Sequence, residues 1–514
     1  MGIVLALVIG VCLAAIACFA LSQVWLALAY RQSKNADELP KTKLVLPQIL
    51  PRVLIQLPIF NEKYVVERLL KSVTSLDYPK ELLTIQLLDD STDDTVLVAQ
   101  RVLRSLALQG HQVAHIRRSN REGFKAGALQ YGLGQNASEF VVVFDADFLP
   151  TKDFIKRILC HFADPEIGMV QTKWVHTNAN YSILTKLMAL AIDNHFSVEQ
   201  GGRQAAGCMI NFNGTAGMWR RKAIDDAGGW SADCLTEDLD LSFRAQFAGW
   251  KFKFVEDIAT PSELPTELQA IRNQQRRWTK GAVETSRKNL GCLWASDRSL
   301  LEKLIGTSHM VNSSIFLPLF VFEVAFLALS FVPGVAVDQF VWFAHIPLAI
   351  TMGALFYTYW VSQRTNDLPA SKQSGFDIIS KIALFLIMTA GFTLENGLAA
   401  FEGLIGKVTP FVRTPKLNIV GKKDPSILHH NYRATTLPVA FYGEVLAAGL
   451  FIFAAAHAAW IGRTAFFDIS LFFATGYSLM IFFTLKDAVS SGTVVVPQSA
   501  GQTNMPETSK YPAE

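Results

Sequence analysis

The chain has 514 residues, 50% of them hydrophobic, and a formal net charge of only +3. This length allows more than one domain, and the hydrophobic fraction is too high for an ordinary soluble enzyme, so membrane segments are expected. The small charge, without a concentrated basic face, excludes a nucleic-acid partner. The six cysteines include no Cys-x-x-Cys pair, which argues against a zinc site or a disulfide framework.

Residues 1–30 predict a transmembrane helix. From Gly2 to Tyr30 the only ionisable side chains are those of Cys and Tyr, and the stretch exceeds the roughly 20 apolar residues that span a bilayer. A cleaved signal peptide is the alternative, but the segment lacks a basic start, and its apolar run exceeds the usual roughly 7 to 15 residues. Residues 31–48 follow as a polar, basic linker.

Residues 49–300 have the pattern of a soluble domain. Short apolar runs at 53–57, 84–88 and 140–144 end in polar residues and predict buried strands. Helical spacing of apolar residues follows the first two of these runs. Alternating strands and helices predict a parallel sheet covered on both faces, with ligands bound beyond the carboxyl ends of its strands.

Membrane segments return after residue 300. Residues 301–361 and 437–486 each predict a pair of transmembrane helices. The apolar stretch 376–406 contains four charged residues, so we expect a membrane-embedded or interfacial helix without a simple crossing. A hairpin within this stretch, which also returns the chain to the same side, remains open.

Basic loops give the orientation. The linker after the first span and residues 407–436 are rich in Lys and Arg, so both are expected in the cytosol. Five full crossings, with 376–406 not crossing, satisfy this requirement. The tail, residues 487–514, is polar and rich in Ser, Thr and Pro, and is predicted to be disordered.

Two carboxylates, Asp145 and Asp147, directly follow the apolar run 140–144 with one residue between them. Such a pair can hold Mg²⁺ or Mn²⁺, whose remaining ligands are water and the phosphates of a substrate, such as the diphosphate of a nucleotide sugar. The alternative is an acidic loop without a ligand.

A second acidic pair, Asp89 and Asp90, ends another predicted strand. Acidic side chains there can accept from a base N–H or a ribose hydroxyl. A helix N-cap, supplied by Ser91, Thr92 or Asp93, is the alternative. We expect both interpretations to hold, for different residues.

A third acidic pair, Glu237 and Asp238, opens an amphipathic stretch that runs to Phe247. A carboxylate here can act as the base that an inverting sugar transfer needs to deprotonate the attacking hydroxyl. The alternative is capping, because acidic residues near a helix start are stabilising.

Gln274, Arg277 and Trp278 combine donors for phosphate with a large aromatic surface on which a sugar ring can stack. The alternative is a basic helix near the membrane whose Trp lies at the interface.

Taken in order, these four elements resemble the D, DxD, TED and QxxRW signature of processive family-2 glycosyltransferases. The resemblance covers about residues 51–288. Within the family, the chain looks like the cellulose synthase-like branch, which includes plant mannan and glucomannan synthases and bacterial β-glycan synthases. Residues 212–215 read Phe-Asn-Gly-Thr where cellulose synthases have Phe-Cys-Gly-Thr, and this departure favours the mannan-synthase side.

The resemblance implies a cytosolic α/β domain of the GT-A type, which is Rossmann-like, beside an α-helical transmembrane region. It also implies roles for individual residues. These are donor binding by Glu62, Asp89, Asp90, Lys125 and Asp145, metal binding by Asp145 and Asp147, catalysis by Asp238 with Glu237, acceptor and diphosphate binding by Gln274, Arg277 and Trp278, and gating by Phe411, Thr414 and Lys416. In the gating segment, Arg413 stands where the family prefers Val.

The implied activity is metal-dependent, inverting transfer of a hexose to a β-linked polysaccharide. GDP-mannose and UDP-glucose both remain open as donors, and the acceptor is a growing glycan, with membrane lipids around the helices. Transfer of one sugar to a lipid is the alternative. A transporter is disfavoured because the acidic clusters lie in the soluble part. The expected location is the plasma membrane in a bacterium or the Golgi membrane in a eukaryote.

Overall fold

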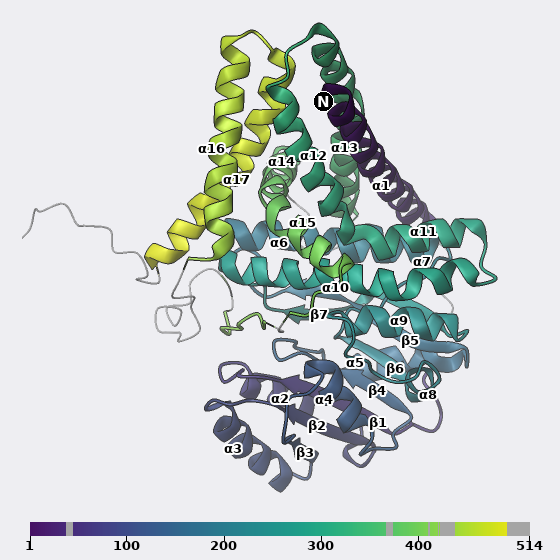
Figure 1. Cartoon of the computed structure of the whole chain (residues 1–514). Helices are drawn as coiled ribbons and strands as arrows, with labels where there is room; N and C mark the ends of the chain where they lie inside the picture. The colour runs from purple at the N-terminus through teal and green to yellow at the C-terminus, as the bar shows by residue number, and fades with distance from the viewer. Residues whose placement is uncertain (37–44, 366–373, 410–411, 420, 422–436, 491–514) are drawn as a thin grey trace, which may run out of the picture.

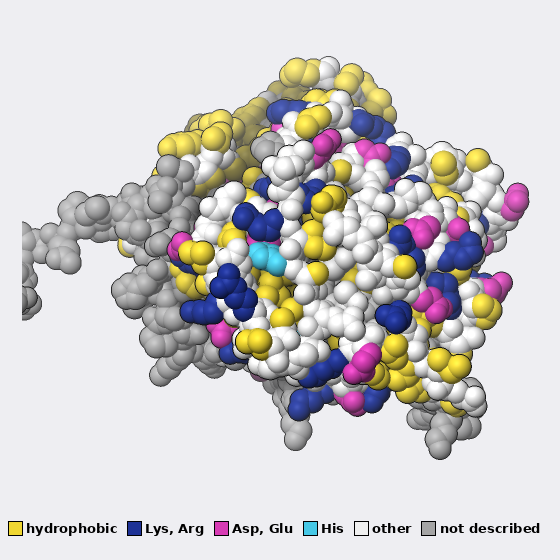
Figure 2. Space-filling view, turned by 90° about the horizontal axis from the view of Figure 1, so that it is seen from below, with side chains coloured by type: hydrophobic (Ala, Val, Ile, Leu, Met, Phe, Trp, Pro, Cys, Tyr) yellow, Lys and Arg dark blue, Asp and Glu magenta, His cyan; other side chains and the backbone are white. Residues whose placement is uncertain are grey.

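The protein was described from a computed structural model, in which residues 1–36, 45–365, 374–409, 412–419, 421 and 437–490 are described. Figure 1 shows an α/β domain at the bottom, a layer of helices above it, and a group of long helices at the top. The lower face of the α/β domain carries Lys, Arg, Asp and Glu side chains intermixed, as expected for a surface in water (Figure 2).

The α/β domain is built on a seven-stranded sheet with the strand order β3-β2-β1-β4-β6-β5-β7. The strands are β1 (Val53–Ile59), β2 (Leu83–Asp89), β3 (Gln112–Ile116), β4 (Phe140–Val143), β5 (Ile167–His176), β6 (Gly217–Arg220) and β7 (Lys251–Ser262). Strand β1 pairs in parallel with both β2 and β4, so the carboxyl ends of these three strands meet at one edge.

The prediction of a parallel sheet is wrong for β6, which runs antiparallel to both β4 and β5. The reason lies in the preceding loop. Ala216, directly before β6, donates its backbone N–H to the carbonyl of Val143 at the end of β4, at 2.9 Å. Strand β6 therefore enters the sheet at the edge where β4 ends, and must run in the opposite direction.

Successive side chains of a strand point to opposite faces of the sheet, and here both sets are apolar, so helices pack against both faces. Val53, Ile55 and Leu57 belong to one buried cluster, and Leu54 belongs to another. The covering helices and short turns are α2 (Val66–Thr74), η1 (Lys80–Leu82), α3 (Thr95–Leu108), α4 (Phe124–Leu133), α5 (Phe154–Leu159), η2 (Cys160–Ala163), α8 (Arg221–Asp226) and α9 (Glu237–Phe247).

A layer of helices separates the sheet from the long apolar helices (Figure 1). It contains α6 (Ile183–Asn194), the π-helical segment η3 (His195–Gly201), α7 (Gly202–Ala205), α10 (Leu268–Ala295) and α11 (Leu300–Val311). A cavity at the carboxyl ends of the strands lies beneath α10.

The upper part holds helices that can cross a membrane. These are α1 (Gly2–Ala36), the continuous run Leu300–Ser330 made of α11, η4 (Asn312–Ile315) and α12 (Phe316–Ser330), α13 (Val335–Arg364), α16 (Val439–Trp460) and α17 (Thr464–Ser490). Within the described part of the chain, five helices are long and apolar enough to span, and a sixth span results only if α14 (Gly375–Gly391) and α15 (Thr393–Leu404) count as one. This pair is bent by 55°.

Both ends of the α14–α15 pair lie on the side of the α/β domain. Gly375 lies beside Arg364, the last residue of α13. At the other end, the carbonyl of Leu404 accepts from Arg287 of α10 at 3.0 Å. This arrangement is compatible with a pair that enters and leaves on the same side, which stays a prediction.

Two helices continue beyond their predicted ends, and their last turns contact β7 and α10. Helix α1 runs to Ala36 instead of residue 30, and its Lys34 pairs with Glu256 of β7 at 2.9 Å. Helix α17 runs to Ser490, and Asp487 accepts from the backbone N–H of Leu268, the first residue of α10, at 2.7 Å. Residues 487–490 are thus helical, and 491–514 lie outside the described residues.

Candidate active site

A cavity of about 180 Å³ opens at the carboxyl ends of β1, β2 and β4, with α10 on its membrane side. It collects residues from segments that are up to 358 positions apart in the sequence, from Pro58 to Lys416. The predicted site residues that line it are Glu62, Asp90, Lys125, Asp145, Asp147, Glu237, Asp238, Gln274, Arg277, Trp278, Thr414 and Lys416.

Two predicted site residues, Asp89 and Phe411, are not among the described residues that line the cavity. Asp89 is buried beneath the cavity, where its carboxylate lies 2.8 Å from the Nε2 atom of His115 and accepts from the backbone N–H of Ser91 at 2.9 Å. Burial alone would raise the pKa of Asp89, but these hydrogen bonds hold it below its usual value. Phe411 lies outside the described residues.

The neighbouring Asp90 faces the cavity, while its carboxylate also accepts from both Nε and Nη2 of Arg118, with Nε at 3.0 Å. The N-cap of α3 is Asp94, which makes no side-chain capping hydrogen bond, so the predicted cap by Ser91, Thr92 or Asp93 is not found. Asp93, one residue earlier, accepts from the backbone N–H of Thr95 at 3.0 Å.

The two carboxylates after β4 each hold a lysine ammonium. Asp145 lies 2.6 Å from Lys125, and Asp147 lies 2.9 Å from Lys416. Burial opposes a charge on Lys125, but Asp145 and Glu237 raise its pKa. The pKa of Lys416 is raised in the same way, chiefly by Asp147 against the effect of burial. At the carboxyl ends of the strands, both Asp145 and Asp147 therefore stabilise a positive charge beside them.

This donor set fits a Mg²⁺ or Mn²⁺ ion. The described residues contain no group of three or more His, Cys, Asp or Glu side chains that could hold a metal by themselves. Mg²⁺ is commonly held by only one or two carboxylates together with substrate phosphates, so Asp145 and Asp147 suffice in a site that also binds a diphosphate.

Asp238 lies in the first turn of α9, next to Glu237. Burial and the charge of Glu237 raise the pKa of Asp238 to about 7, although Lys125 and Arg277 oppose the shift. A Cβ atom at Gly214 would lie 2.9 Å from the Oδ2 atom of Asp238, and Gly214 has a φ of +79°. Glycine is required there, and it leaves the carboxylate accessible from the cavity.

The buried polar atoms around the cavity that have no hydrogen-bond partner within the described part of the chain include Oε1 of Gln274, Oε2 of Glu62 and Oγ1 of Thr414. Buried polar groups are nearly always paired, so atoms of this kind at a cavity wall indicate a polar ligand. These three come from α10, from the loop after β1 and from the segment 412–419, so the ligand touches three sides.

The segment 412–419 closes one side of the cavity. The carboxylate of Glu263, directly after β7, accepts from the backbone N–H groups of Leu417 and Asn418, both at 2.9 Å. Arg413 lies 3.2 Å from Glu62. Burial nevertheless raises the pKa of Glu62 to about 8. The predicted gating residues Thr414 and Lys416 are therefore held against the strand ends.

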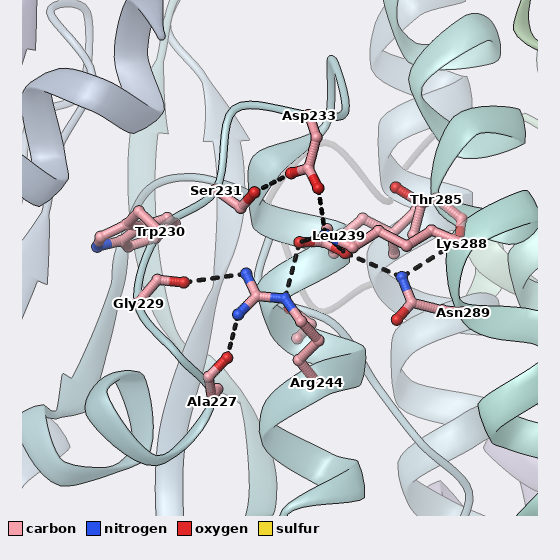
Figure 3. Close-up of polar contacts among 12 residues, drawn as sticks. Ala227, Gly229, Trp230, Ser231, Asp233, Leu239, Arg244, Thr285, Lys288 and Asn289 are labelled. Carbon is pink, nitrogen blue, oxygen red and sulfur yellow. Dashed lines mark hydrogen bonds and ion pairs between the residues drawn. The ribbon is translucent and has the colours of Figure 1, made fainter. Parts of the chain in front are cut away.

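A clamp joins α9, which carries Asp238, to α10, which carries Arg277. The buried carboxylate of Asp240 accepts from Arg244 at 2.8 Å and from Asn289 at 2.9 Å, and pairs with Lys288 at 3.0 Å. Figure 3 shows Arg244 also reaching the carbonyls of Ala227 and Gly229, while Lys288 reaches Asp233. The clamp fixes the two helices and the adjoining loop as one unit.

The sequence analysis missed Asp240 and Glu263. Glu263 follows β7 at the same edge of the sheet as Asp145, and this position was an available signal. Asp240 gave none, because its partners on α10 are 48 and 49 residues away.

A second, larger cavity of about 580 Å³ lies among the membrane helices and α6. Its walls are mostly apolar, but Gln23, Asn194 and Asn396 are buried there with side-chain atoms that have no partner in the described residues. Gln275 of α10 also lines this cavity, and Gln274, the preceding residue, lines the first one. The two cavities thus lie on either side of the same turn of α10.

Comparison with known proteins identifies the class. Residues 51–281 match the family model described as "Glycosyltransferase like family 2". The match lies where the motifs predicted it. The mannosyltransferase PcManGT from Pyrobaculum calidifontis, solved in complex with GDP-Man and Mn²⁺, has the same fold: it superposes with a TM-score of 0.51 at 18% sequence identity, covering 77% of this chain and 100% of that one. The GT-A-type fold class is confirmed.

The particular branch follows from curated relatives. Glucomannan 4-beta-mannosyltransferase 2 from Arabidopsis thaliana is 42% identical over 245 residues, which is 46% of each chain. Glucomannan 4-beta-mannosyltransferase 1 from Cyamopsis tetragonoloba is 39% identical over 263 residues, or 50% of each chain. The predicted resemblance to this branch is confirmed. The matches span about half the length of these relatives.

Proposed function

We propose that this protein is an inverting mannosyltransferase that transfers mannose from GDP-mannose to a growing β-linked mannan or glucomannan chain at the membrane. The observation that carries the proposal is the meeting of Asp238, the Asp145–Asp147 pair and Arg277 in one cavity. The relatives named above supply the sugar and the acceptor class, and they favour GDP-mannose over UDP-glucose.

The chemistry assigned to the side chains follows from their positions. Asp238, with its pKa near 7, takes the proton of the acceptor hydroxyl as that oxygen attacks the anomeric carbon. Attack from the side opposite the diphosphate inverts an α-linked donor and gives a β-linkage. Arg277 and Lys125, which line the same cavity, stabilise the negative charge that develops on the leaving diphosphate.

Asp145 and Asp147 would hold the Mg²⁺ or Mn²⁺ ion, which when bound supplies further positive charge next to the diphosphate. Trp278 offers a flat surface for the acceptor sugar, and Gln274 offers its unpaired side-chain oxygen to a hydroxyl. The segment 412–419 excludes water from the donor side, which protects the nucleotide sugar from hydrolysis.

A polymer is the product that the second cavity supports. It adjoins the active site across α10 and extends among helices that can cross a membrane. A chain leaving Trp278 has space there, and the unpaired side chains of Gln23, Asn194 and Asn396 offer partners for hydroxyl groups. We place the α/β domain in the cytosol, at the plasma membrane of a bacterium or the Golgi membrane of a eukaryote.

The test is incorporation of radiolabel by the purified, detergent-solubilised protein. Labelled GDP-mannose and UDP-glucose are supplied separately with Mn²⁺ or Mg²⁺, and the products are divided into polymer and lipid extract. We expect label from GDP-mannose in a polymer that β-mannanase degrades, and none with the Asp238→Asn variant. Label confined to the lipid extract would instead assign single-sugar transfer to a lipid, and incorporation from UDP-glucose alone would overturn the donor.

A further inference from the structure

A cluster of buried charged side chains lies where α10 meets the membrane helices. Both Nη atoms of Arg272 donate to the carboxylate of Glu444, with Nη2 at 2.8 Å. The same guanidinium donates to Glu395 at 3.2 Å and to the hydroxyl of Thr484 at 3.0 Å. Arg272 is 1% exposed and Glu444 is 0% exposed. One side chain of α10 thereby holds α15, α16 and α17 together.

A cluster of this kind defines geometry more than it adds stability. Removing a carboxylate and a guanidinium from water is costly, and a well-packed apolar pair of similar volume is often no less stable. The planar guanidinium instead binds a carboxylate in one fixed, two-pronged arrangement. The cluster therefore sets the position of α10 along and around its own axis relative to α16.

The position of Arg272 makes this geometry relevant to the active site. Gln274 and Arg277 follow it on the same helix, and Arg277 lies roughly 7.5 Å further along the axis at 1.5 Å per residue. Near the other end of α10, Lys288 and Asn289 bind Asp240 of α9. The residues over the cavity lie between two fixed points, one in the membrane region and one on the helix of Asp238.

We propose that Arg272, Glu444 and Glu395 form a positioning cluster for the transfer reaction: they set where Arg277 and Trp278 stand above the donor cavity and thereby couple the membrane helices to the α/β domain. The proposal rests on the proposed function for its effect on rate. The cluster touches no cavity-lining group of the sheet, where Asp90, Lys125 and Asp145 hold the donor. It therefore governs the transfer step and leaves donor binding largely unchanged.

The experiment compares Glu444→Gln with Glu323→Gln as a matched control. Glu323 is also buried in a membrane helix, at 3% exposed, and it accepts from Tyr477 of α17 at 2.6 Å. We expect Glu444→Gln to lower kcat by about 10- to 100-fold, the loss that small misplacements of catalytic groups cause, with KM for GDP-mannose changed by less than about twofold. Glu323→Gln should leave both constants near those of the unchanged protein.

Hydrogen–deuterium exchange supplies a readout that does not need turnover. Loss of the cluster should increase exchange over residues 268–278 of α10 in Glu444→Gln and leave this segment unchanged in Glu323→Gln. If the unchanged protein transfers no sugar from any donor, the proposed function fails, while the exchange result still decides whether the cluster fixes α10. Unchanged exchange and unchanged kcat in Glu444→Gln would overturn the inference.

A triple variant, Arg272→Met with Glu444→Leu and Glu395→Gln, separates positioning from folding. It replaces all three charged side chains of the cluster, so no charge is left buried without its partner. We expect its melting temperature in detergent to match or exceed that of Glu444→Gln, while kcat stays low. Recovery of full kcat together with thermal stability would show that the cluster serves folding alone, and would refute a positioning role.

Discussion

Asp238 has a raised pKa, and its carboxylate is accessible from the cavity. Burial and Glu237 disfavour its charge, whereas Lys125 and Arg277 favour it, so the carboxylate keeps a pKa of about 7. Gly214, with no side chain, leaves space in front of its Oδ2 atom. A general base works best when its pKa lies near the working pH, because it is then both ionised and basic enough to take a proton.

This pKa predicts the pH dependence of transfer. The base must be ionised, so the rate rises as pH increases through about 7 and falls below it, to about one tenth of the plateau one pH unit lower. We expect an acid limb of slope one in kcat/KM for GDP-mannose between pH 5.5 and 8.5. The exposed Asp226→Asn variant should keep the profile, and Asp238→Asn should abolish transfer. A rate independent of pH over this range would contradict the assignment.

At the scale of elements, the clamp on Asp240 fixes α9 to α10. Replacing Asp240 with Ala leaves the cations of Arg244 and Lys288, together with the Asn289 amide, without their shared acceptor. Removing one partner of a buried pair costs about 3–5 kcal/mol. We expect a melting temperature in detergent that is several degrees lower.

The control for this prediction is Glu166→Ala. Glu166 pairs with Lys251 at 2.6 Å, and both side chains are 62% exposed. An exposed pair of this kind contributes about 0–1 kcal/mol, so the melting temperature should barely move. Equal effects of the two variants would show that the Asp240 contacts do not hold the helices.

The segment 412–419 depends on two acidic side chains of the α/β domain, Asp147 and Glu263. Replacing Lys416 or Glu263 with Ala removes one of these attachments. We expect faster trypsin cleavage after Arg413 in both variants, detected by mass spectrometry of the fragments. Lys251→Ala, which removes an exposed cation elsewhere, is the control. Cleavage at the rate of the unchanged protein would show that these contacts do not restrain the segment.

The sequence predicts features that consecutive residues determine, but not those that depend on contacts between residues far apart in the chain. Asp145 and Asp147 could be found because the strand before them and the acids themselves are consecutive. The direction of β6 could not, because it is only four residues long and its orientation depends on pairing with β4 and β5. The attachment of Glu263 to Leu417, 154 residues away, left no local pattern. The role of each motif residue in the reaction stays a prediction.

At the scale of the whole molecule, the bent α14–α15 pair decides the number of crossings. Its ends lie beside Arg364 and Arg287, both on the side of the α/β domain. We predict five crossings, with Ser374 and Lys407 on the same side of the membrane.

Single cysteines test this topology in a variant without the native cysteines. Cysteines at Ser374 and Lys407 should both react with a membrane-impermeant maleimide only from the side of the α/β domain. Cysteines at Gly334 and Gly462, in the turns after α12 and α16, should react from the other side. Reaction of positions 374 and 407 from opposite sides would show that the pair crosses the membrane.

The contacts of α10 with the last helices also bear on how the protein is made. Glu444 binds Arg272, and Asp487 accepts from the first backbone N–H of α10. The ribosome releases α10 well before α16 and α17, because synthesis proceeds from the N-terminus. During insertion, the sheet with its carboxylates can fold while α10 still lacks these attachments. On the proposed mechanism the nascent chain therefore stays inactive until its final membrane helices are in place.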